Sequence, residues 1–225
     1  IAIVYGACVA MVQDDIKKMI AYSSVSHMGY VILGLFALNQ IGVTGAMYQM
    51  LNHGVATGGL FLLVGILYER KHTRAITAYS GLAKTLPLFS IVWLVMTFSS
   101  IALPGTNGFI GEFLILQGAF LAMPAFTAVA ATGVILGAVY MLWLTQRILF
   151  GTPDAKKSEG LTDINWREFA YLAPLIALVF VMGLYPKIFF DRMEPSILEF
   201  TKRVSAPAPA AEASLRKGQI HAQHD

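Results

Sequence analysis

The sequence contains few charged side chains and only one cysteine. Asp, Glu, Lys and Arg make up 13% of its 225 residues, whereas 56% are hydrophobic and the mean hydropathy is +0.64. Soluble globular domains carry about 25% charged residues, so this composition indicates an integral membrane protein. The lone Cys8 excludes a disulfide framework and a thiolate metal site within the chain. The small net charge of +3 gives no indication of nucleic-acid binding.

Motifs for redox or nucleotide chemistry are also missing. The sequence has no phosphate-binding glycine loop, nucleophile elbow, haem attachment motif or iron–sulfur cysteine pattern. We therefore expect no cofactor and no metal in this chain. The segment 205–225 is of low complexity and is predicted to be disordered. Its histidines, His221 and His224, are predicted to be solvated and not to bind metal.

Long hydrophobic runs predict an all-α transmembrane helix bundle over residues 1–186. The opening run, residues 1–13, is shorter than the roughly 20 residues that a span needs, and it lacks signal-peptide features. It is predicted to be the end of a truncated helix, in the C-terminal part of a longer chain. Single helices are predicted over residues 19–38, 41–68, 125–150 and 169–185. A further run, 86–122, is interrupted from Leu103 to Gly108, where LPGTNG cannot continue a helix. The fold predicted is a polytopic bundle of about six spans.

The positions of the basic residues predict how the interrupted run crosses the membrane. Cytoplasmic connections of membrane proteins are enriched in Lys and Arg. If this run crosses once, as a discontinuous helix, all three basic connections lie on the cytoplasmic side. Two crossings would move the last connection to the other side, so a single crossing is predicted. The basic residues concerned are Lys17, Lys18, Arg70, Lys71, Arg74, Lys84, Arg147, Lys156, Lys157 and Arg167.

Beyond the last span, residues 187–204 are predicted to lie at the membrane surface as an amphipathic segment. Pro195 is expected to start a short helix there. Near the other end of the chain, Asp14 and Asp15 are expected to cap the helix that follows them. The residues expected to share one face of the short helix are Ile197, Leu198, Thr201 and Val204.

Glu112 is the only acidic, basic or histidine side chain between Lys84 and Arg147. A charged side chain at the centre of a bilayer costs about 2.5–3.5 kcal/mol even on the lenient insertion scale, which favours a functional role. Glu112 follows the break, where the positive end of a helix stabilises a carboxylate while burial disfavours its charge. Such opposed effects suit an acid that gains and loses a proton. The alternative is that LPGTNG forms a simple loop, which would leave backbone groups unpaired in hydrocarbon.

His27 and His53 are the only ionisable side chains between Lys18 and Glu69 apart from tyrosines. Imidazole titrates near neutral pH, so a histidine in the middle of a span can exchange protons. The alternative is that both only link helices by hydrogen bonds. Their occurrence in consecutive helices, followed by Glu112 in the next, favours a proton path. The polar neighbours expected are Ser23, Ser24 and Tyr30 around His27, and Gln49 and Thr57 around His53.

Three stretches together resemble a known family. QDDIKKMIAYSSVSHMGYVILG, MLNHGVATGGLFLLVGILYERKHTR and LPGTNGFIGEFLIL are similar to the antiporter-like membrane subunits of respiratory complex I, and most similar to the M type, called chain 4 in mitochondria. The resemblance implies that His27 and His53 are the central histidines of a proton path. It also implies that Glu112 is the terminal acid of a discontinuous helix, where the related L and N types typically carry Lys. The lysines and the glutamate of the first half of the path would lie upstream of Ile1.

The resemblance implies a proton-translocating subunit of an NADH:quinone oxidoreductase in an energy-transducing membrane, most simply the bacterial inner membrane. The other membrane subunits of complex I would be its partners, and FMN and iron–sulfur clusters would belong to partner subunits. Two alternatives remain open. The chain could instead serve a multi-subunit Na⁺/H⁺ antiporter or a membrane-bound hydrogenase, which share these motifs. It could also be a structural helix bundle that only scaffolds other subunits.

Overall fold

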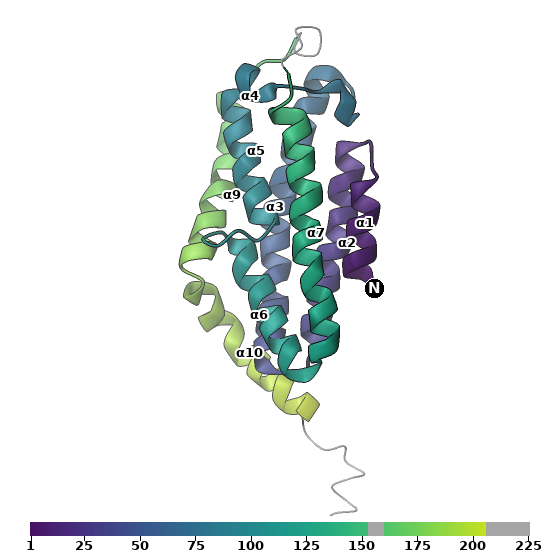
Figure 1. Ribbon diagram of the computed structural model, residues 1–225. Coiled ribbons are helices and arrows are strands. Elements are labelled where there is room, and N and C mark those ends of the chain that lie inside the picture. The colour runs from purple at the N-terminus through teal and green to yellow at the C-terminus, as the bar shows by residue number, and fades with distance from the viewer. Residues whose placement is uncertain (153–159, 206–225) are drawn as a thin grey trace, which may run out of the picture.

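The computed structural model describes residues 1–152 and 160–205, and within these ranges the chain is helical and has no β-strand (Figure 1). This confirms the predicted all-α bundle. The predicted disordered tail, with His221 and His224, lies outside the described residues except for Ser205, which ends the last helix. The elements are α1 (Ala2–Met11), α2 (Ile16–Phe36), α3 (Gln40–Lys71), η1 (Ile76–Ala78), α4 (Leu82–Thr85), α5 (Pro87–Ser100), α6 (Asn107–Ala122), α7 (Pro124–Leu149), α9 (Trp166–Leu184) and α10 (Lys187–Ser205).

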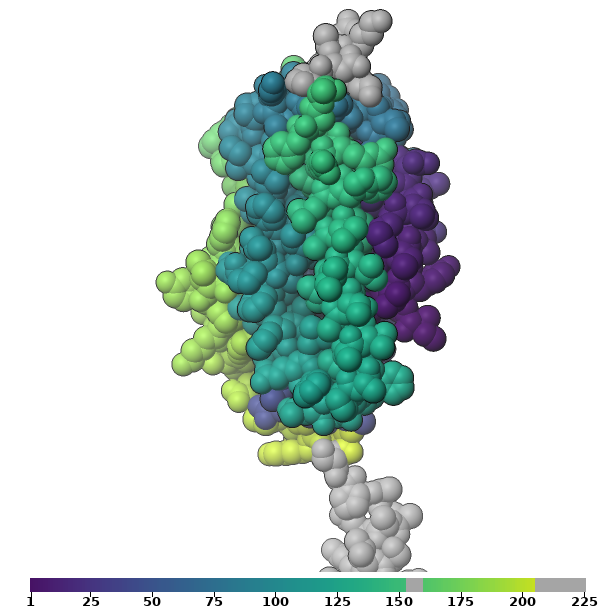
Figure 2. Space-filling view, in the orientation of Figure 1, coloured from purple at the N-terminus to yellow at the C-terminus, as the bar shows by residue number. Residues whose placement is uncertain are grey.

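The described helices agree with the predicted spans. By length and composition, α2, α3, α7 and α9 are each able to cross a membrane, and α1, α5 and α6 are shorter apolar helices. In Figure 1 these helices run side by side, with α3 in the interior of the bundle and α7 across its front. The space-filling view shows α7 closing that face, with α1 and α2 on one flank and α9 on the other (Figure 2). The centre of α3 is therefore surrounded by protein on several sides.

The interrupted run is one discontinuous crossing, because α5 and α6 follow each other in the same direction along the bundle (Figure 1). The break spans residues 101–106, two residues earlier than predicted at both ends. Ala102 and Gly105 adopt positive φ values of 57° and 93°, which end one helix and redirect the chain into the next. Asn107 and Gly108, expected in the break, belong to the first turn of α6. Gly108 lies there so close to the Ser99 carbonyl that a larger residue would collide with it.

The basic connections gather at one end of the bundle, which agrees with a single crossing. Asp15 accepts a hydrogen bond of 3.0 Å from the Lys18 backbone N–H and so caps α2, as predicted. The same carboxylate pairs with Arg74 at 3.3 Å, and Asp15 forms a β-bridge with Ala75. The turn between α1 and α2 is thereby joined to the connection that follows α3.

The start of α9 is anchored to the end of α3 by a buried ion pair. Asn165 and Glu168 form a capping box at the first turn of α9. Glu168 also accepts a hydrogen bond of 2.6 Å from Arg70, and both side chains are only 10% exposed. Arg70 additionally donates to the Asp163 carbonyl at 3.0 Å. The described part of the third basic connection therefore lies at the same end as the other two, whereas Lys156 and Lys157 lie outside the described residues.

The segment after the last span is a longer helix than predicted. Pro195 lies inside α10 and does not start it, so that expectation is wrong. The Pro186 carbonyl accepts from the backbone N–H groups of Phe189 and Phe190, and this first turn begins the helix before Pro195 is reached. The Phe190 ring packs edge-on to Tyr48 of α3, with ring centroids 4.8 Å apart. A position of residues 187–204 at the membrane surface stays a prediction.

Two apolar cores lie on either side of a polar layer. The larger core includes Leu60 and Leu63 of α3 and Trp93 of α5, all fully buried. The smaller one includes Ala46 of α3 and Ile115 of α6. Along α3, the residues between Ala46 and Leu60 therefore pass between the cores, and it is here that the polar side chains of the candidate site are found.

Candidate proton-transfer site

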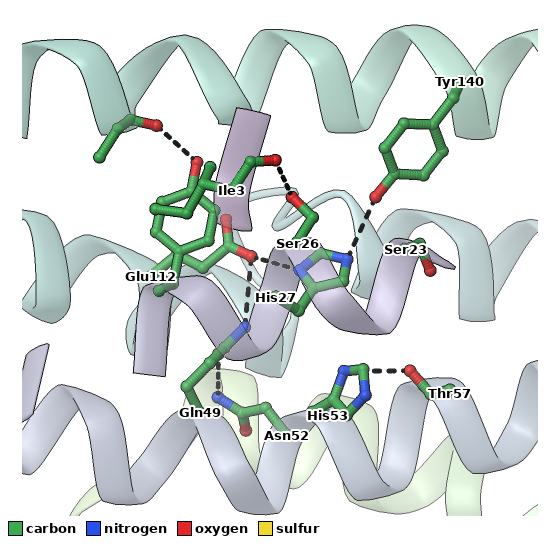
Figure 3. Close-up of polar contacts among 12 residues, drawn as sticks. Ile3, Ser23, Ser26, His27, Gln49, Asn52, His53, Thr57, Glu112 and Tyr140 are labelled. Atoms are coloured by element: carbon green, nitrogen blue, oxygen red, sulfur yellow. Dashed lines mark hydrogen bonds and ion pairs between the residues drawn. The ribbon is translucent and has the colours of Figure 1, made fainter. Parts of the chain in front are cut away.

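Glu112 and His27 form a buried pair in the middle of the bundle (Figure 3). Glu112 comes from the second turn of α6 and His27 from the middle of α2; they are 4% and 6% exposed. His27 Nδ1 lies 3.0 Å from Glu112 Oε1. The break places this part of α6 against α2 and α3, so an acid and a base that are 85 residues apart in sequence share a hydrogen bond.

Gln49 and Tyr140 complete the immediate surroundings of this pair. Gln49 Nε2, on α3, donates to Glu112 Oε1 at 3.2 Å, so that one carboxylate oxygen faces both Gln49 and His27. On the other side of the imidazole, the Tyr140 hydroxyl of α7 lies 3.5 Å from His27 Nε2. Both ring nitrogens of His27 thus face a polar group, which fixes the ring orientation.

His53 lies beside His27 without a direct hydrogen bond to it. The ring centroids are 5.6 Å apart, and His53 Nδ1 lies 3.1 Å from the Thr57 hydroxyl. A cavity of about 10 Å³ is lined by both histidines, and its volume is about what one water molecule requires. Most of its lining residues have polar side chains, and the cavity reaches the two helix ends that flank the break: His27, Gln49, Asn52, His53, Ala56, Thr57, Ser99, Ser100 and Gly108.

This arrangement can move a proton over short distances. Glu112 and His27 can exist as an ion pair, with the shared proton on His27, or as a neutral pair, with that proton on Glu112. The cavity between His27 and His53 suits a bridging water that would extend the path to α3. Within residues 1–152 and 160–205, no three His, Cys, Asp or Glu side chains come together as ligands for a metal ion.

The structure brings the three predicted residues together but changes some expected neighbours. Thr57 contacts His53 as predicted, whereas Gln49 contacts Glu112 instead of His53. The side chains predicted around His27 hydrogen-bond to backbone carbonyls: Ser23 and Ser24 donate to Ile20, and Tyr30 donates to Ala130.

Sequence reasoning missed two polar contributors. Tyr140 is the only tyrosine of α7, in the middle of an apolar helix, and that was an available signal. Asn52 donates through Nδ2 to Gln49 Oε1 at 3.2 Å; the two residues are three apart on α3, so helical spacing was an available signal here.

An interrupted helix among continuous ones, with a buried acid near the break, is typical of membrane proteins that transport ions. Residues 1–139 match the model of the family described as NADH:quinone oxidoreductase/Mrp antiporter, transmembrane. This match covers more than half of the 225 residues, and the chain belongs to that family.

Individual relatives agree with this family. The chain is 46% identical over 206 residues to subunit M of NADH-quinone oxidoreductase from Rhodobacter capsulatus, covering 92% of the chain and 40% of the relative. It is 42% identical over 205 residues to chain 4 of NADH-ubiquinone oxidoreductase from Chondrus crispus, covering 91% and 42%. A chain of respiratory complex I from Thermus thermophilus with bound NADH superimposes with a TM-score of 0.86 at 36% identity, covering 91% and 43%. The chain therefore spans about two fifths of these relatives.

Proposed function

We propose that this chain is part of a proton-translocating membrane subunit of an NADH:quinone oxidoreductase, in which Glu112, His27 and His53 carry protons. The observation that carries the proposal is the buried 3.0 Å contact between His27 Nδ1 and Glu112 Oε1 beside the helix break. A carboxylate in the interior of an apolar bundle is costly unless its charge is used or compensated. Here the compensating partner is itself able to lose its proton.

Protons pass in this proposal to His53, then to His27, and finally to Glu112. Between the two imidazoles a proton moves through a water held in the small polar cavity. When His27 gives its Nδ1 proton to the carboxylate, both groups become neutral, and the charge that attracted the proton is removed. Glu112 then releases the proton toward the opposite side of the membrane.

We assign the redox chemistry to partner subunits, which would hold FMN and the iron–sulfur clusters and bind NADH and quinone. Other antiporter-like subunits of the complex would be the neighbours of this chain in the membrane. The 46% identity to a bacterial subunit M supports the inner membrane of a bacterial cell as its location.

The test is neutralisation of the acid in the complete subunit, assembled in its complex. Glu112→Gln keeps the shape of the side chain and removes the exchangeable proton, so proton translocation falls sharply while assembly continues. Glu112→Asp keeps part of the translocation. Glu199→Gln is the matched control, because it neutralises an exposed carboxylate of α10. Translocation by Glu112→Gln at the rate of this control would show that the chain is a scaffold and not a carrier.

The family description also includes Mrp antiporters, so an Na⁺/H⁺ antiporter subunit is the second candidate. The two differ in what drives transport. Proton movement driven by NADH oxidation in sodium-free vesicles supports the first proposal. Proton movement that requires a sodium gradient, and continues without NADH, supports the antiporter.

A further inference from the structure

A chain of polar side chains, the amide ladder (Gln49, Asn52 and Asn107), leads from Glu112 to the break between α5 and α6. Gln49 donates to Glu112, and Asn52 Nδ2 donates to Gln49 Oε1, both at 3.2 Å (Figure 3). Asn107 Nδ2, in the first turn of α6, donates to the Asn52 backbone carbonyl at 3.4 Å. Ser99, in the last turn of α5, donates to Asn107 Oδ1 at 2.5 Å. The ladder thus connects the carboxylate to both helices that meet at the break.

The ladder is pressed directly against the backbone of α6. A Cβ atom at Gly111 would collide with Gln49 Oε1 and would lie 2.8 Å from Asn52 Nδ2. Both amides are buried, at 3% and 1% exposure. Since no side chain separates them from α6, any rotation of these amides acts on the helix that carries Glu112.

One acceptor of the ladder is unsatisfied. Asn52 Oδ1 is buried and has no hydrogen-bond partner among the described residues. A buried acceptor without a partner destabilises the arrangement that contains it. Turning an amide by 180° exchanges its oxygen with its NH₂ group. If Gln49 and Asn52 turn together, the NH₂ group of Gln49 donates to Asn52 Oδ1, and the Asn52 NH₂ group takes the unpaired position. Each orientation therefore leaves one polar atom of Asn52 unpaired, and neither is strongly favoured by the ladder itself.

The two orientations suit the two protonation states of Glu112. An ionised carboxylate only accepts hydrogen bonds, so it favours the NH₂ group of Gln49, as observed. A protonated acid can donate its O–H to the carbonyl that a turned Gln49 would present. The titratable side chains that face Glu112 are His27 and Tyr30 from α2 and Tyr140 from α7, with His53 from α3 behind His27.

We infer that Gln49 and Asn52 are positioning residues that transmit the protonation state of Glu112 to the α5/α6 break by turning their amides together. They do not carry protons, because amides do not titrate near neutral pH. The inference rests on the proposed function, since it requires Glu112 to exchange protons. It adds a mechanical link: when the two amides turn, their close contact with α6 at Gly111 changes, and Gly111 lies five residues after the break.

The first test is infrared difference spectroscopy on the assembled complex. The carbonyl band of protonated Glu112 is identified by its loss in Glu112→Gln. Gln49→Met removes donor and acceptor at similar length, so this band moves to higher wavenumber and proton translocation slows about ten-fold. Tyr48→Phe is the matched control, because it removes a buried hydrogen bond from the next residue of α3, to the Met182 carbonyl. It leaves the band in place. An unmoved band in Gln49→Met overturns the inference.

The second test asks whether the break senses Glu112 through the ladder. Backbone hydrogen exchange over residues 101–108 is compared between wild type and Glu112→Gln, and again in an Asn52→Leu background. We expect Glu112→Gln to change exchange at the break only when Asn52 is present. Asn52→Ala, which removes the amide without adding a charge, gives the same comparison if Asn52→Leu does not assemble. An equal change in both backgrounds contradicts the ladder. Normal translocation by Glu112→Gln contradicts only the proposed function. The infrared band and the hydrogen exchange at the break can still be measured, and they test the ladder separately.

Discussion

Glu112 and Glu168 are both buried carboxylates, yet their partners differ in kind. Glu168, 8% exposed, is hydrogen-bonded at 2.6 Å to Arg70, which stays protonated in proteins. Glu112, 4% exposed, is hydrogen-bonded at 3.0 Å to His27, whose imidazole can be neutral or protonated. The first acid thus faces a permanent cation, whereas the second faces a side chain that exists in two charge states.

The two acids also lie in different parts of the fold. The pair of Arg70 and Glu168 lies at the end of the bundle and joins the last turn of α3 to the first turn of α9. The pair of His27 and Glu112 lies between two apolar cores, beside a cavity and a helix break. Burial of the carboxylate therefore does not distinguish these two acids; the nature of the partner does.

The largest expected effects on stability and on translocation come from neutralising each of the two acids in turn. Glu168→Gln leaves Arg70 buried without its counter-charge and lowers the free energy of unfolding by about 3 kcal/mol. Proton translocation per assembled complex stays at the wild-type rate. Glu112→Gln gives the opposite pattern, with stability largely kept and translocation lost. Thermal unfolding and translocation in vesicles measure the two effects. If Glu168→Gln stopped translocation in a fully assembled complex, the division between a structural and a functional acid would be wrong.

The next effect tests the titratable partner. In the double variant His27→Ala/His53→Ala, Glu112 keeps its donor from Gln49 but loses both imidazoles of the path. We expect translocation to fall about a hundred-fold, the lower end of what a positioned acid–base group contributes. A variant of His72, an exposed histidine that ends α3, serves as the control: His72→Ala should leave the rate unchanged. An unchanged rate in the double variant would count heavily against a histidine relay.

Much of this comparison could be predicted from the sequence. The scarcity of charge in apolar runs isolates Glu112, His27 and His53, and LPGTNG marks the break within two residues. These features are local, because hydropathy and helix-breaking residues act over a few positions. The capping role of Asp15 was predictable for the same reason.

The contacts between helices could not be predicted in this way. Which side chain meets Glu112 depends on how α2, α3 and α6 pack, and that packing is set by close approaches such as the one at Gly111. Gln49 was therefore assigned to the wrong partner. Asn52 was missed for another reason, because its contact with Gln49 lies within α3 and its three-residue spacing was not used. The predicted start of the last helix was also wrong. Proline is frequent as the first residue of a helix, but Pro195 lies inside α10.

The smallest expected effect on translocation comes from Tyr140, which contacts His27 on the side of the ring away from Glu112. Tyr140 contacts His27 Nε2 at 3.5 Å, a long hydrogen bond that orients the ring but does not bind the carboxylate. Tyr140→Phe removes only the hydroxyl, so we expect translocation to slow about two-fold, the cost of a weak hydrogen bond. Rate measurements in vesicles test this, with Tyr79→Phe as the control because Tyr79 lies in the connection after α3. A loss as large as that of Glu112→Gln would mean that protons reach His27 through α7, and the comparison would then have to include Tyr140 as a carrier.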